Sequence, residues 1–253
     1  MKHEFVGKAA LVIGGTTGIG ASVVNDFAAN GCDVAFAGLE REEGTALEQR
    51  INAANLGRAL FVQTDVRDEA AVEELVGKAS DRFGRIHCAV NNAGVEGPFG
   101  PLQEVSEADF DRVMDINVKG VWLGMKYQIR HMLAHGGGAI VNTASSAGVV
   151  SIPQIAIYSA SKHAIVGLSK AAALEQARSG IRINVVAPGP VRTGLLSRMV
   201  QGHIDLESIA NSVPMGRISD PQEIASAILW LCSDAASFVT GHTLLADGGL
   251  TIA

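Results

Sequence analysis

The sequence predicts an α/β protein built on a doubly wound parallel sheet, and three observations support this prediction. Apolar runs of strand length recur along the first half of the chain, helical patterns separate them, and a glycine-rich loop follows the first run. Near-continuous apolar strands are typical of a parallel sheet that is covered on both faces. Strands that alternate with helices form right-handed βαβ units, which place helices on both sides of the sheet.

Five apolar segments have the length expected of buried strands. They are AALVI, DVAFAG, ALFVQ, HCAV and GAIVNTA, at residues 9–13, 33–38, 59–63, 87–90 and 138–144. No apolar stretch of the sequence reaches the length needed to span a membrane.

Helix signals occur between and after these runs. Ser106 with Asp109 forms a capping-box pattern that opens a long helix. Asp220 is placed to cap another helix, with Pro221 at its first position. Apolar residues recur at helical spacing in two segments: Val72, Leu75, Val76, Ala79 and Phe83 in one, and Ile224, Ala227, Ile228 and Leu231 in the other. Because no linker, charge block or internal repeat divides the chain, we predict a single domain over residues 1–253.

The composition excludes several classes of partner. The chain has 253 residues, of which 47% are hydrophobic, and its formal net charge is −6. An acidic chain without a basic cluster is not expected to bind nucleic acid. The N-terminal segment reaches glycine-rich sequence too early for a secretory signal peptide. We therefore expect a cytoplasmic protein that binds neither membranes nor nucleic acid.

The cysteines and histidines show no metal-binding pattern. Cys32, Cys88 and Cys232 are far apart, so we expect buried, reduced thiols rather than disulfides or metal ligands. His131 and His135 are four residues apart, but no third ligand accompanies them. We place both on a solvated helix face and predict no catalytic metal.

A glycine loop follows the first strand. Gly14, Gly18 and Gly20 have the spacing G-x-x-x-G-x-G and stand at the entrance to a helix. Such glycines allow a tight turn and a close approach of the backbone, and the N–H groups at the helix N-terminus bind a pyrophosphate. Glycines can also simply make a turn. The segment NNAG at 91–94 favours the nucleotide interpretation, because it follows another strand and would lie at the same edge of the sheet.

The pair Tyr158 and Lys162 is the second chemical signal. In a helix, residues four apart share one face, so the phenol and the ammonium can approach each other. The phenol of tyrosine has a pKa near 10, and a cation close by is expected to lower it, which would make Tyr158 a usable general acid and base. A pair of this kind can also be no more than surface neighbours.

These motifs resemble those of the short-chain dehydrogenase/reductase family along the whole chain. The matching segments are Ile13 to Gly20, the NNAG of 91–94, Asn117, Ser145, Tyr158 with Lys162, Pro188 to Thr193, and the DGG of 247–249. One departure is Ile13, where the family usually has threonine, whose hydroxyl would tie this turn to the neighbouring strand. The resemblance implies a Rossmann-like sheet and an enzyme that transfers hydride between a nicotinamide cofactor and a secondary alcohol or ketone.

The resemblance also implies four catalytic residues. Tyr158 would be the general acid and base, and Lys162 would contact the nicotinamide ribose. Ser145 would donate a hydrogen bond to the substrate oxygen. Asn117 would hold a water molecule in a proton relay; read alone, it is better explained as a partner for a helix end or backbone group. The local pattern does not distinguish Ser145 from Ser146 as the active-site serine. The family's spacing between this serine and the tyrosine indicates Ser145.

The resemblance further implies a set of cofactor-binding residues. They are Gly14, Thr16, Thr17, Gly18, Ile19, Gly20, Glu40, Asp65, Val66, Asn91, Ala93, Gly94, Tyr158, Lys162, Pro188, Gly189, Val191 and Thr193.

The end of the second strand does not give the usual indication of NAD or NADP. The position that is usually Asp in the family is Gly38, and the next position is Leu39. Glu40 is the nearby acid and Arg41 the adjacent base, so we favour NAD with Glu40 contacting the ribose. Glu40 could equally be an exposed charge at a helix start.

Substrate specificity is expected in the segment at about 194–214, which we predict to be a lid over the substrate; an ordinary surface helix is the alternative. Glu96 is expected near the same pocket. The sequence is most similar in character to family members that act on cyclic alcohols and diols and to those labelled glucose 1-dehydrogenase.

The family is usually tetrameric, so we expect a homotetramer. The alternatives are an epimerase or dehydratase on the same scaffold, or a non-catalytic nucleotide-binding regulatory protein.

Overall fold

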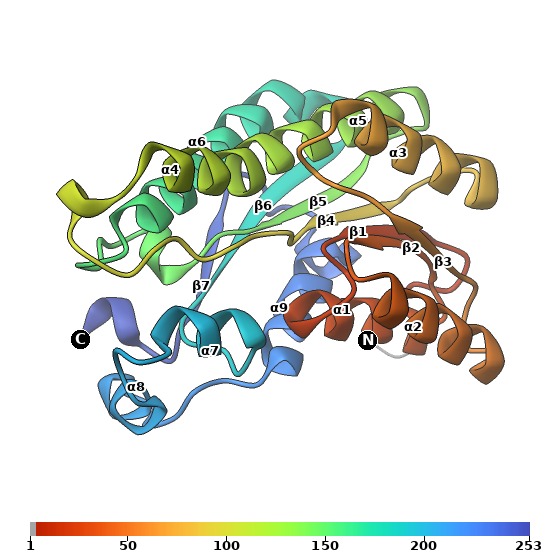
Figure 1. Ribbon diagram of the computed structural model, residues 1–253. Helices are drawn as coiled ribbons and strands as arrows, with labels where there is room; N and C mark the ends of the chain where they lie inside the picture. Colours follow the sequence, from red (N-terminus) through yellow and green to blue (C-terminus); the bar gives the residue numbers. More distant parts are fainter. Residues whose placement is uncertain (1–3) are drawn as a thin grey trace.

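A parallel sheet forms the centre of the molecule in the computed structural model, which describes residues 4–253. The sheet has seven strands in the order β3-β2-β1-β4-β5-β6-β7 (Figure 1). The strands are β1 (Ala9–Ile13), β2 (Asp33–Gly38), β3 (Ala59–Gln63), β4 (Cys88–Asn91), β5 (Gly138–Thr143), β6 (Ile181–Pro188) and β7 (Thr243–Ala246). Each neighbouring pair is parallel, so the predicted doubly wound fold is confirmed.

Helices cover both faces of the sheet (Figure 1). On one face lie α1 (Gly18–Ala29), α2 (Arg41–Ala54) and α9 (Pro221–Cys232). On the other lie α3 (Glu69–Phe83), α4 (Glu107–Met114), α5 (Gly120–Ala134) and α6 (Ala156–Gln176). Two short helices, α7 (Gly194–Val200) and α8 (Leu206–Ser212), lie outside these layers.

The predicted strands agree closely with the structure, and two strands were missed. The segments 9–13, 33–38 and 59–63 match β1, β2 and β3 at both ends, while β4 begins one residue later than predicted and β5 ends one residue earlier. In β6, the polar residues Arg182 and Asn184 interrupt the apolar pattern. The strand accommodates them because both side chains donate hydrogen bonds to the carbonyl of Val239. The edge strand β7 has four residues, none of them fully buried.

The helix signals also agree with the structure. Asp220 caps α9 in a capping box with Glu223, and Pro221 stands at the first helical position. Ser106 caps α4, its hydroxyl accepting a bond from the Asp109 N–H at 3.1 Å. The long helix predicted there is interrupted, because a π-helical turn over 115–119 joins α4 to α5. Such a turn inserts one extra residue, and it is frequent at functional sites.

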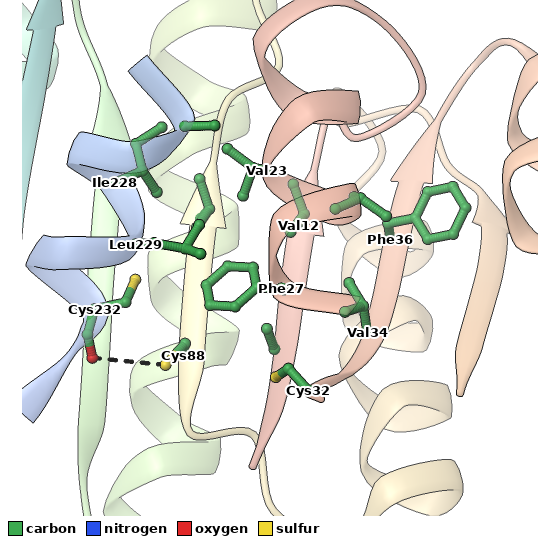
Figure 2. Close-up of a cluster of buried hydrophobic side chains, with 14 of the residues drawn as sticks. Val12, Val23, Phe27, Cys32, Val34, Phe36, Cys88, Ile228, Leu229 and Cys232 are labelled. Carbon is green, nitrogen blue, oxygen red and sulfur yellow. Dashed lines mark hydrogen bonds between the residues drawn. The ribbon is translucent and has the colours of Figure 1, made fainter. Parts of the chain in front are cut away.

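The hydrophobic core has two main parts, one on each face of the sheet. Figure 2 shows the part between the sheet and the helices α1 and α9, where the ring of Phe27 lies among apolar side chains. The three cysteines lie at one end of this cluster, and all three are buried and free, as predicted. The Cys88 thiol donates a weak hydrogen bond to the carbonyl of Cys232 at 3.8 Å. Burial raises the pKa of the Cys32 thiol, which keeps it protonated at neutral pH.

The prediction that both His131 and His135 face solvent is wrong for His131. Its side chain is buried, and its Nε2 accepts a hydrogen bond from the Ile86 N–H at 3.0 Å. The ring stacks on that of His135, with centroids 4.0 Å apart. Burial lowers the pKa of His131 below its ordinary value, and the charges of His135 and Arg85 lower it further. His131 therefore joins helix α5 to the chain that enters β4.

We expect this histidine to make the fold sensitive to acid. Below the ordinary pKa of 6.5, the unfolded chain takes up a proton while folded His131 stays neutral. The free energy of unfolding should then fall by up to about 1.4 kcal/mol per pH unit from this residue. Urea unfolding at about pH 8 and about pH 5 should show that His131→Gln costs less stability at the lower pH.

The control is His242→Gln, because His242 is exposed and its side chain has no hydrogen bond among the described residues. Its effect should not depend on pH. If His131→Gln costs the same stability at both pH values, His131 is not the acid-sensitive group. His87, whose pKa is also lowered by burial, would then be the next residue to test.

Among residues 4–253, no helix combines the length and apolar character that crossing a membrane requires. The same residues contain no group of three or more histidine, cysteine or acidic side chains arranged to hold a metal ion.

Candidate active site

A large cavity opens where the strand order reverses, between β1 and β4. Strands on either side of this point are connected in opposite directions, which leaves a crevice beyond their carboxyl ends. The cavity has a volume of about 690 Å³ and is lined by the loops that follow β1, β2, β3, β4, β5 and β6. A volume of this size is typical of a ligand-binding site.

The glycine loop after β1 packs tightly against the NNAG loop after β4. Gly14 has φ +77°, and a Cβ there would lie 2.4 Å from the backbone nitrogen of Ala93. A Cβ on Gly20 would lie 1.8 Å from the carbonyl oxygen of Gly14. Both positions therefore need glycine for close backbone contact. The side chain of Asn92 donates a hydrogen bond to the Gly14 carbonyl at 2.9 Å and fixes the two loops together.

These contacts also explain how the turn tolerates Ile13 in place of the family's threonine. The N–H groups of Gly14 and Gly15 both donate to the carbonyl of Ala37 on β2, each at 2.8 Å. Ile13 itself is buried in the core. The backbone and Asn92 thus hold the turn without a threonine hydroxyl.

The N-terminus of α1 is suited to a phosphate group. Its N-cap residue, Thr17, makes no side-chain hydrogen bond to the helix, and the first turn carries no acidic residue. The first N–H groups of a helix have no partner within the helix and favour an anion. Gly18 has φ +54°, and Thr193 lies directly beside it. The loop and helix end therefore fit the pyrophosphate of a dinucleotide.

Tyr158 and Lys162 lie on one face of α6 and both line the cavity. Both side chains are buried, and the Lys162 Nζ lies 5.5 Å from the centre of the phenol ring. Lys162 also donates a hydrogen bond to the carbonyl of Thr143 at 3.1 Å. Ser145, which follows β5, lines the same wall of the cavity. Three groups able to exchange protons or donate hydrogen bonds thus meet at one wall of the cavity.

The expected lowering of the Tyr158 pKa by Lys162 is wrong in this structure. Burial raises the pKa of the phenol to about 12; the polar side chain of Ser145 opposes the rise, and the negative charge of Glu96 adds to it. Burial likewise lowers the pKa of Lys162 to about 8. The withdrawal from water is the main cause of both shifts, because desolvation disfavours the charged form of each group. At neutral pH, Tyr158 is therefore held as a neutral phenol.

Asn117 lies in the π-helical turn and is completely buried. Its side-chain oxygen accepts a hydrogen bond from the Val95 N–H at 2.8 Å, and its amide donates to the Val95 carbonyl at 3.0 Å. The amide also donates to the Ser161 hydroxyl at 3.0 Å. Asn117 thus ties the loop after β4 to α6 next to Lys162.

The adenosine end of the cavity has an unusual arrangement. A Cβ on Gly38 would lie 2.4 Å from the Thr16 Oγ1, so the side chain of Thr16 fills the place of the family's aspartate. The Thr16 hydroxyl donates a hydrogen bond of 2.6 Å to the Glu40 carboxylate. Arg41 points elsewhere, because its guanidinium binds the side-chain oxygen of Gln63 at 2.7 and 3.0 Å.

The structure brings most of the predicted residues to the cavity wall. Those that line it are Gly14, Thr16, Thr17, Gly18, Ile19, Glu40, Asp65, Val66, Ala93, Gly94, Ser145, Tyr158, Lys162, Pro188, Gly189, Val191 and Thr193. Gly20, Asn91 and Asn117 do not line it, although all three were predicted as site residues.

Asn91 is the clearest correction among these three. Its side chain is buried and exchanges hydrogen bonds with Gln128 at 2.8 and 2.9 Å, and it donates to Asn142 at 2.7 Å. This network joins β4 and β5 to α5, so the side chain is occupied inside the fold. Asn92, the next residue of the motif, lines the cavity instead.

Several residues of the wall belong to no motif in the sequence. Ile152 and Ile155, which precede α6, line the cavity together with Arg112 of α4. The segment predicted as a lid contributes only through α7, whose Leu195, Leu196, Arg198 and Met199 line the cavity. Helix α8 is described throughout and contributes no residue to this wall.

Comparison with known proteins decides the family. A family model described as enoyl-(acyl carrier protein) reductase, of the short-chain alcohol dehydrogenase type, matches residues 14–251. The chain is 46% identical over 250 residues to 2,5-dichloro-2,5-cyclohexadiene-1,4-diol dehydrogenase of Sphingobium indicum, with 98% of each chain covered. The chain belongs to the short-chain dehydrogenase/reductase family. Another relative in this family is the cyclohexanol dehydrogenase of an Acinetobacter species, 38% identical with 99% of this chain and 98% of the relative covered.

Solved structures of short-chain dehydrogenase/reductases have the same fold. Levodione reductase superimposes with a TM-score of 0.94 at 34% identity, covering 98% of this chain and 99% of its own. ElxO with NADP bound gives a TM-score of 0.90 at 35% identity, covering 97% of this chain and 99% of its own. A 3-ketoacyl-(acyl carrier protein) reductase from Brucella melitensis with NADH gives 0.91 at 32% identity, covering 98% and 99%. The predicted family, fold class and enzyme class are confirmed: the chain is a short-chain dehydrogenase/reductase acting on CH–OH groups with a nicotinamide cofactor.

Proposed function

We propose that this enzyme interconverts a secondary alcohol and a ketone on a cyclic, mainly apolar molecule. The observation that carries the proposal is the position of Tyr158, Ser145 and Lys162 in the same cavity as the glycine loop. A cofactor on the glycine loop and a substrate beside Tyr158 would therefore share one enclosed space. A nicotinamide cofactor supplies or accepts the hydride when it is bound.

Each of the chain's own groups has a distinct role in this proposal. Tyr158 gives a proton to the ketone oxygen during reduction and removes it from the alcohol during oxidation. Ser145 donates a hydrogen bond to the same oxygen and orients it. Lys162, fixed by the Thr143 carbonyl, holds the cofactor ribose. Asn117 positions the Val95 backbone and the Ser161 hydroxyl beside Lys162, and we propose that it supports a proton relay there.

The substrate end of the cavity favours an apolar ring. Ala147, Ile155 and Tyr158 form a small cluster, against which Phe99, Ile152 and Met199 pack. Such a wall buries hydrocarbon surface and leaves the reacting oxygen to the polar groups. The names of the cyclohexadienediol and cyclohexanol dehydrogenases support a cyclic alcohol as the substrate class.

Turnover of a panel of secondary alcohols and ketones, followed by the absorbance of the reduced nicotinamide, tests this function. We expect cyclic secondary alcohols and ketones of six-membered rings to react faster than open-chain ones. Preference for open-chain substrates would refute the cyclic assignment, and no turnover with any of them would favour the binding-protein alternative. No described feature favours an epimerase or a dehydratase.

We propose that NAD is the preferred cofactor. The carboxylate of Glu40 lines the cavity and is held by Thr16, in the place where an acidic group accepts a hydrogen bond from the adenosine ribose. The same carboxylate would repel the additional phosphate of NADP. Arg41, the adjacent base, is engaged with Gln63.

Glu40→Gln should weaken NAD binding about tenfold, since a hydrogen bond to a charged group is worth about 1.5–3 kcal/mol. It should also narrow the difference between NAD and NADP affinity, because the repulsion is lost. Titration of both cofactors by fluorescence measures the two effects. Glu42→Gln is the matched control, because Glu42 is exposed in the first turn of α2 and does not line the cavity. Tight binding of NADP alone by the wild type would refute the assignment.

We also propose that the enzyme is a cytoplasmic homotetramer. Several large apolar side chains are strongly exposed, including Leu174, Phe238 and Ile252 at 83%, 104% and 87%. Exposed apolar surface of this kind marks contacts between subunits. The three free, buried cysteines suit a reducing compartment.

A further inference from the structure

The loop after β4 and the helix α7 meet through an ion pair at the substrate end of the cavity. The guanidinium of Arg198 donates two hydrogen bonds to the Glu96 carboxylate, at 2.7 and 3.2 Å. The pair is bidentate, which is the strong and directional form of this interaction. Arg198 lines the cavity, whereas the Glu96 side chain is only 19% exposed.

The Glu96 side of this contact is rigidly held. Arg112 of α4 donates a hydrogen bond to the Glu96 carbonyl at 3.2 Å. The preceding residue, Val95, is bound through both backbone groups by Asn117. Burial raises the pKa of the Glu96 carboxyl, but the bonds from Arg198, a backbone hydrogen bond and the charges of Arg198 and Arg112 together hold the pKa below its ordinary value. Glu96 is therefore a charged, fixed anchor.

The α7 side has much less local support. The helix has seven residues, from Gly194 to Val200, and a helix of this length is not stable without tertiary contacts. Thr193 caps it, its hydroxyl oxygen accepting one hydrogen bond of 3.3 Å from the Leu196 N–H. Exposed residues follow it, with Gly202 at φ +76°. Its position must therefore be determined by what it touches.

A second contact joins the same two segments. The ring of His203, just after α7, stacks on Phe99 with centroids 4.3 Å apart and an angle of 18° between the planes. Between the two contacts, Met199 packs on the apolar cluster that contains Tyr158. The ion pair and the stacked rings thus hold α7 over the substrate end at two points.

We propose that Glu96 and Arg198 form a latch that keeps α7 closed over the substrate. This inference rests on the proposed function, because it assumes that the substrate lies beside Tyr158. Substrate exchange requires α7 to move away, and breaking the ion pair is the step that frees it. Glu96 and Arg198 are positioning residues in this arrangement: they control how long the substrate stays, and the proton passes through neither of them.

Hydrogen–deuterium exchange of the peptides covering 194–204 tests the latch without cofactor or substrate. Glu96→Gln, Arg198→Gln and the double variant should each speed exchange there at least threefold, and to the same extent, because each removes the same contact. Exchange in β1 and β4 should not change. Raising the salt concentration should speed exchange in the wild type and not in Glu96→Gln, since salt screens an ion pair.

The matched control is Arg58→Gln, which breaks another bidentate pair, between Arg58 and Asp33. Neither residue lines the cavity, so exchange over 194–204 should stay at the wild-type rate. The exchanged pair Glu96→Arg with Arg198→Glu should restore slow exchange. Unchanged exchange in the single variants, or an effect of the double variant equal to both single effects added, would overturn the latch.

The kinetic test uses a cyclic alcohol that the wild type turns over. Glu96→Gln should raise KM at least fivefold, because the substrate leaves faster. The kcat for alcohol oxidation should stay equal or rise, because the Glu96 charge that helps to raise the pKa of Tyr158 is lost. Faster exchange with an unchanged KM would refute the proposal that the latch controls substrate access. If the wild type oxidised no alcohol, the proposed function would fail, and the exchange result would still stand as a measurement of the ion pair.

Discussion

Tyr158→Phe should reduce kcat by about 10²–10⁴-fold, which is the usual contribution of a general acid or base. The substitution removes one hydroxyl and keeps the ring that packs against Ile155 and Ala147. The cofactor affinity should therefore change little. Steady-state kinetics with a ketone, together with fluorescence titration of the cofactor, separates these two quantities.

The raised pKa of Tyr158 adds a pH dependence to this prediction. Ketone reduction needs the protonated phenol, which a pKa of about 12 maintains at neutral pH. Alcohol oxidation needs the phenolate, whose fraction rises about tenfold per pH unit below the pKa. The rate of oxidation should therefore increase with pH well above neutrality, while the rate of reduction should not. Tyr158→Phe should remove this difference.

Tyr127→Phe is the matched control, because the chain has only these two tyrosines. The Tyr127 hydroxyl donates to Glu69 at 2.9 Å on the outer helices and does not line the cavity. Its loss should leave kcat within about twofold of the wild type, because no proton of the reaction passes through it. Retention of wild-type turnover by Tyr158→Phe would refute the acid–base role.

Lys162→Met should abolish turnover and at the same time remove a pH-dependent loss of stability. Burial lowers the pKa of Lys162 from 10.5 to about 8, so the folded chain releases the proton more readily than the unfolded chain. The contribution of Lys162 to stability is therefore highest above pH 10.5 and is lost as the pH falls towards 8. At neutral pH, the buried ammonium costs about 3 kcal/mol, at about 1.4 kcal/mol per pKa unit.

The difference in free energy of unfolding between wild type and Lys162→Met measures this cost. It should shift in favour of the wild type by up to about 3 kcal/mol between neutral pH and about pH 10.5. The cysteines and other groups titrate in both proteins and cancel in the difference. Lys170→Met, an exposed lysine two turns along α6, should show no such shift. A variant that keeps turnover, or a difference that does not depend on pH, would contradict the prediction.

The fold was largely predictable because its signals are local. The runs at 9–13, 33–38 and 59–63 are largely apolar and give way to glycine or polar residues at their ends, so their ends coincide with the strands. Strand β6 was missed because Arg182 and Asn184 satisfy backbone carbonyls from within a buried strand. That partnership depends on Val239, more than fifty residues away, and no local pattern reveals it.

Most residues that line the cavity could be predicted from the sequence, whereas the pKa of Tyr158 could not. The motif positions identified Ser145, Tyr158 and Lys162, and all three line the cavity. The predicted direction of the Tyr158 pKa shift was wrong. The shift depends on how much water the fold excludes and not on the spacing of two residues. Asn91 was misplaced for a related reason: its partners Gln128 and Asn142 come together only in the folded structure.

The contact between Thr16 and Gly38 constrains how cofactor preference could evolve or be engineered. An aspartate introduced at position 38 would place its Cβ 2.4 Å from the Thr16 hydroxyl oxygen, so the Thr16 side chain must shift or be replaced to accommodate it. Either change releases Glu40 from its hydrogen bond. A mutational route from Glu40 held by Thr16 to the family's usual aspartate at position 38 therefore passes through an intermediate in which neither the Glu40 carboxylate nor an aspartate carboxylate is held in place.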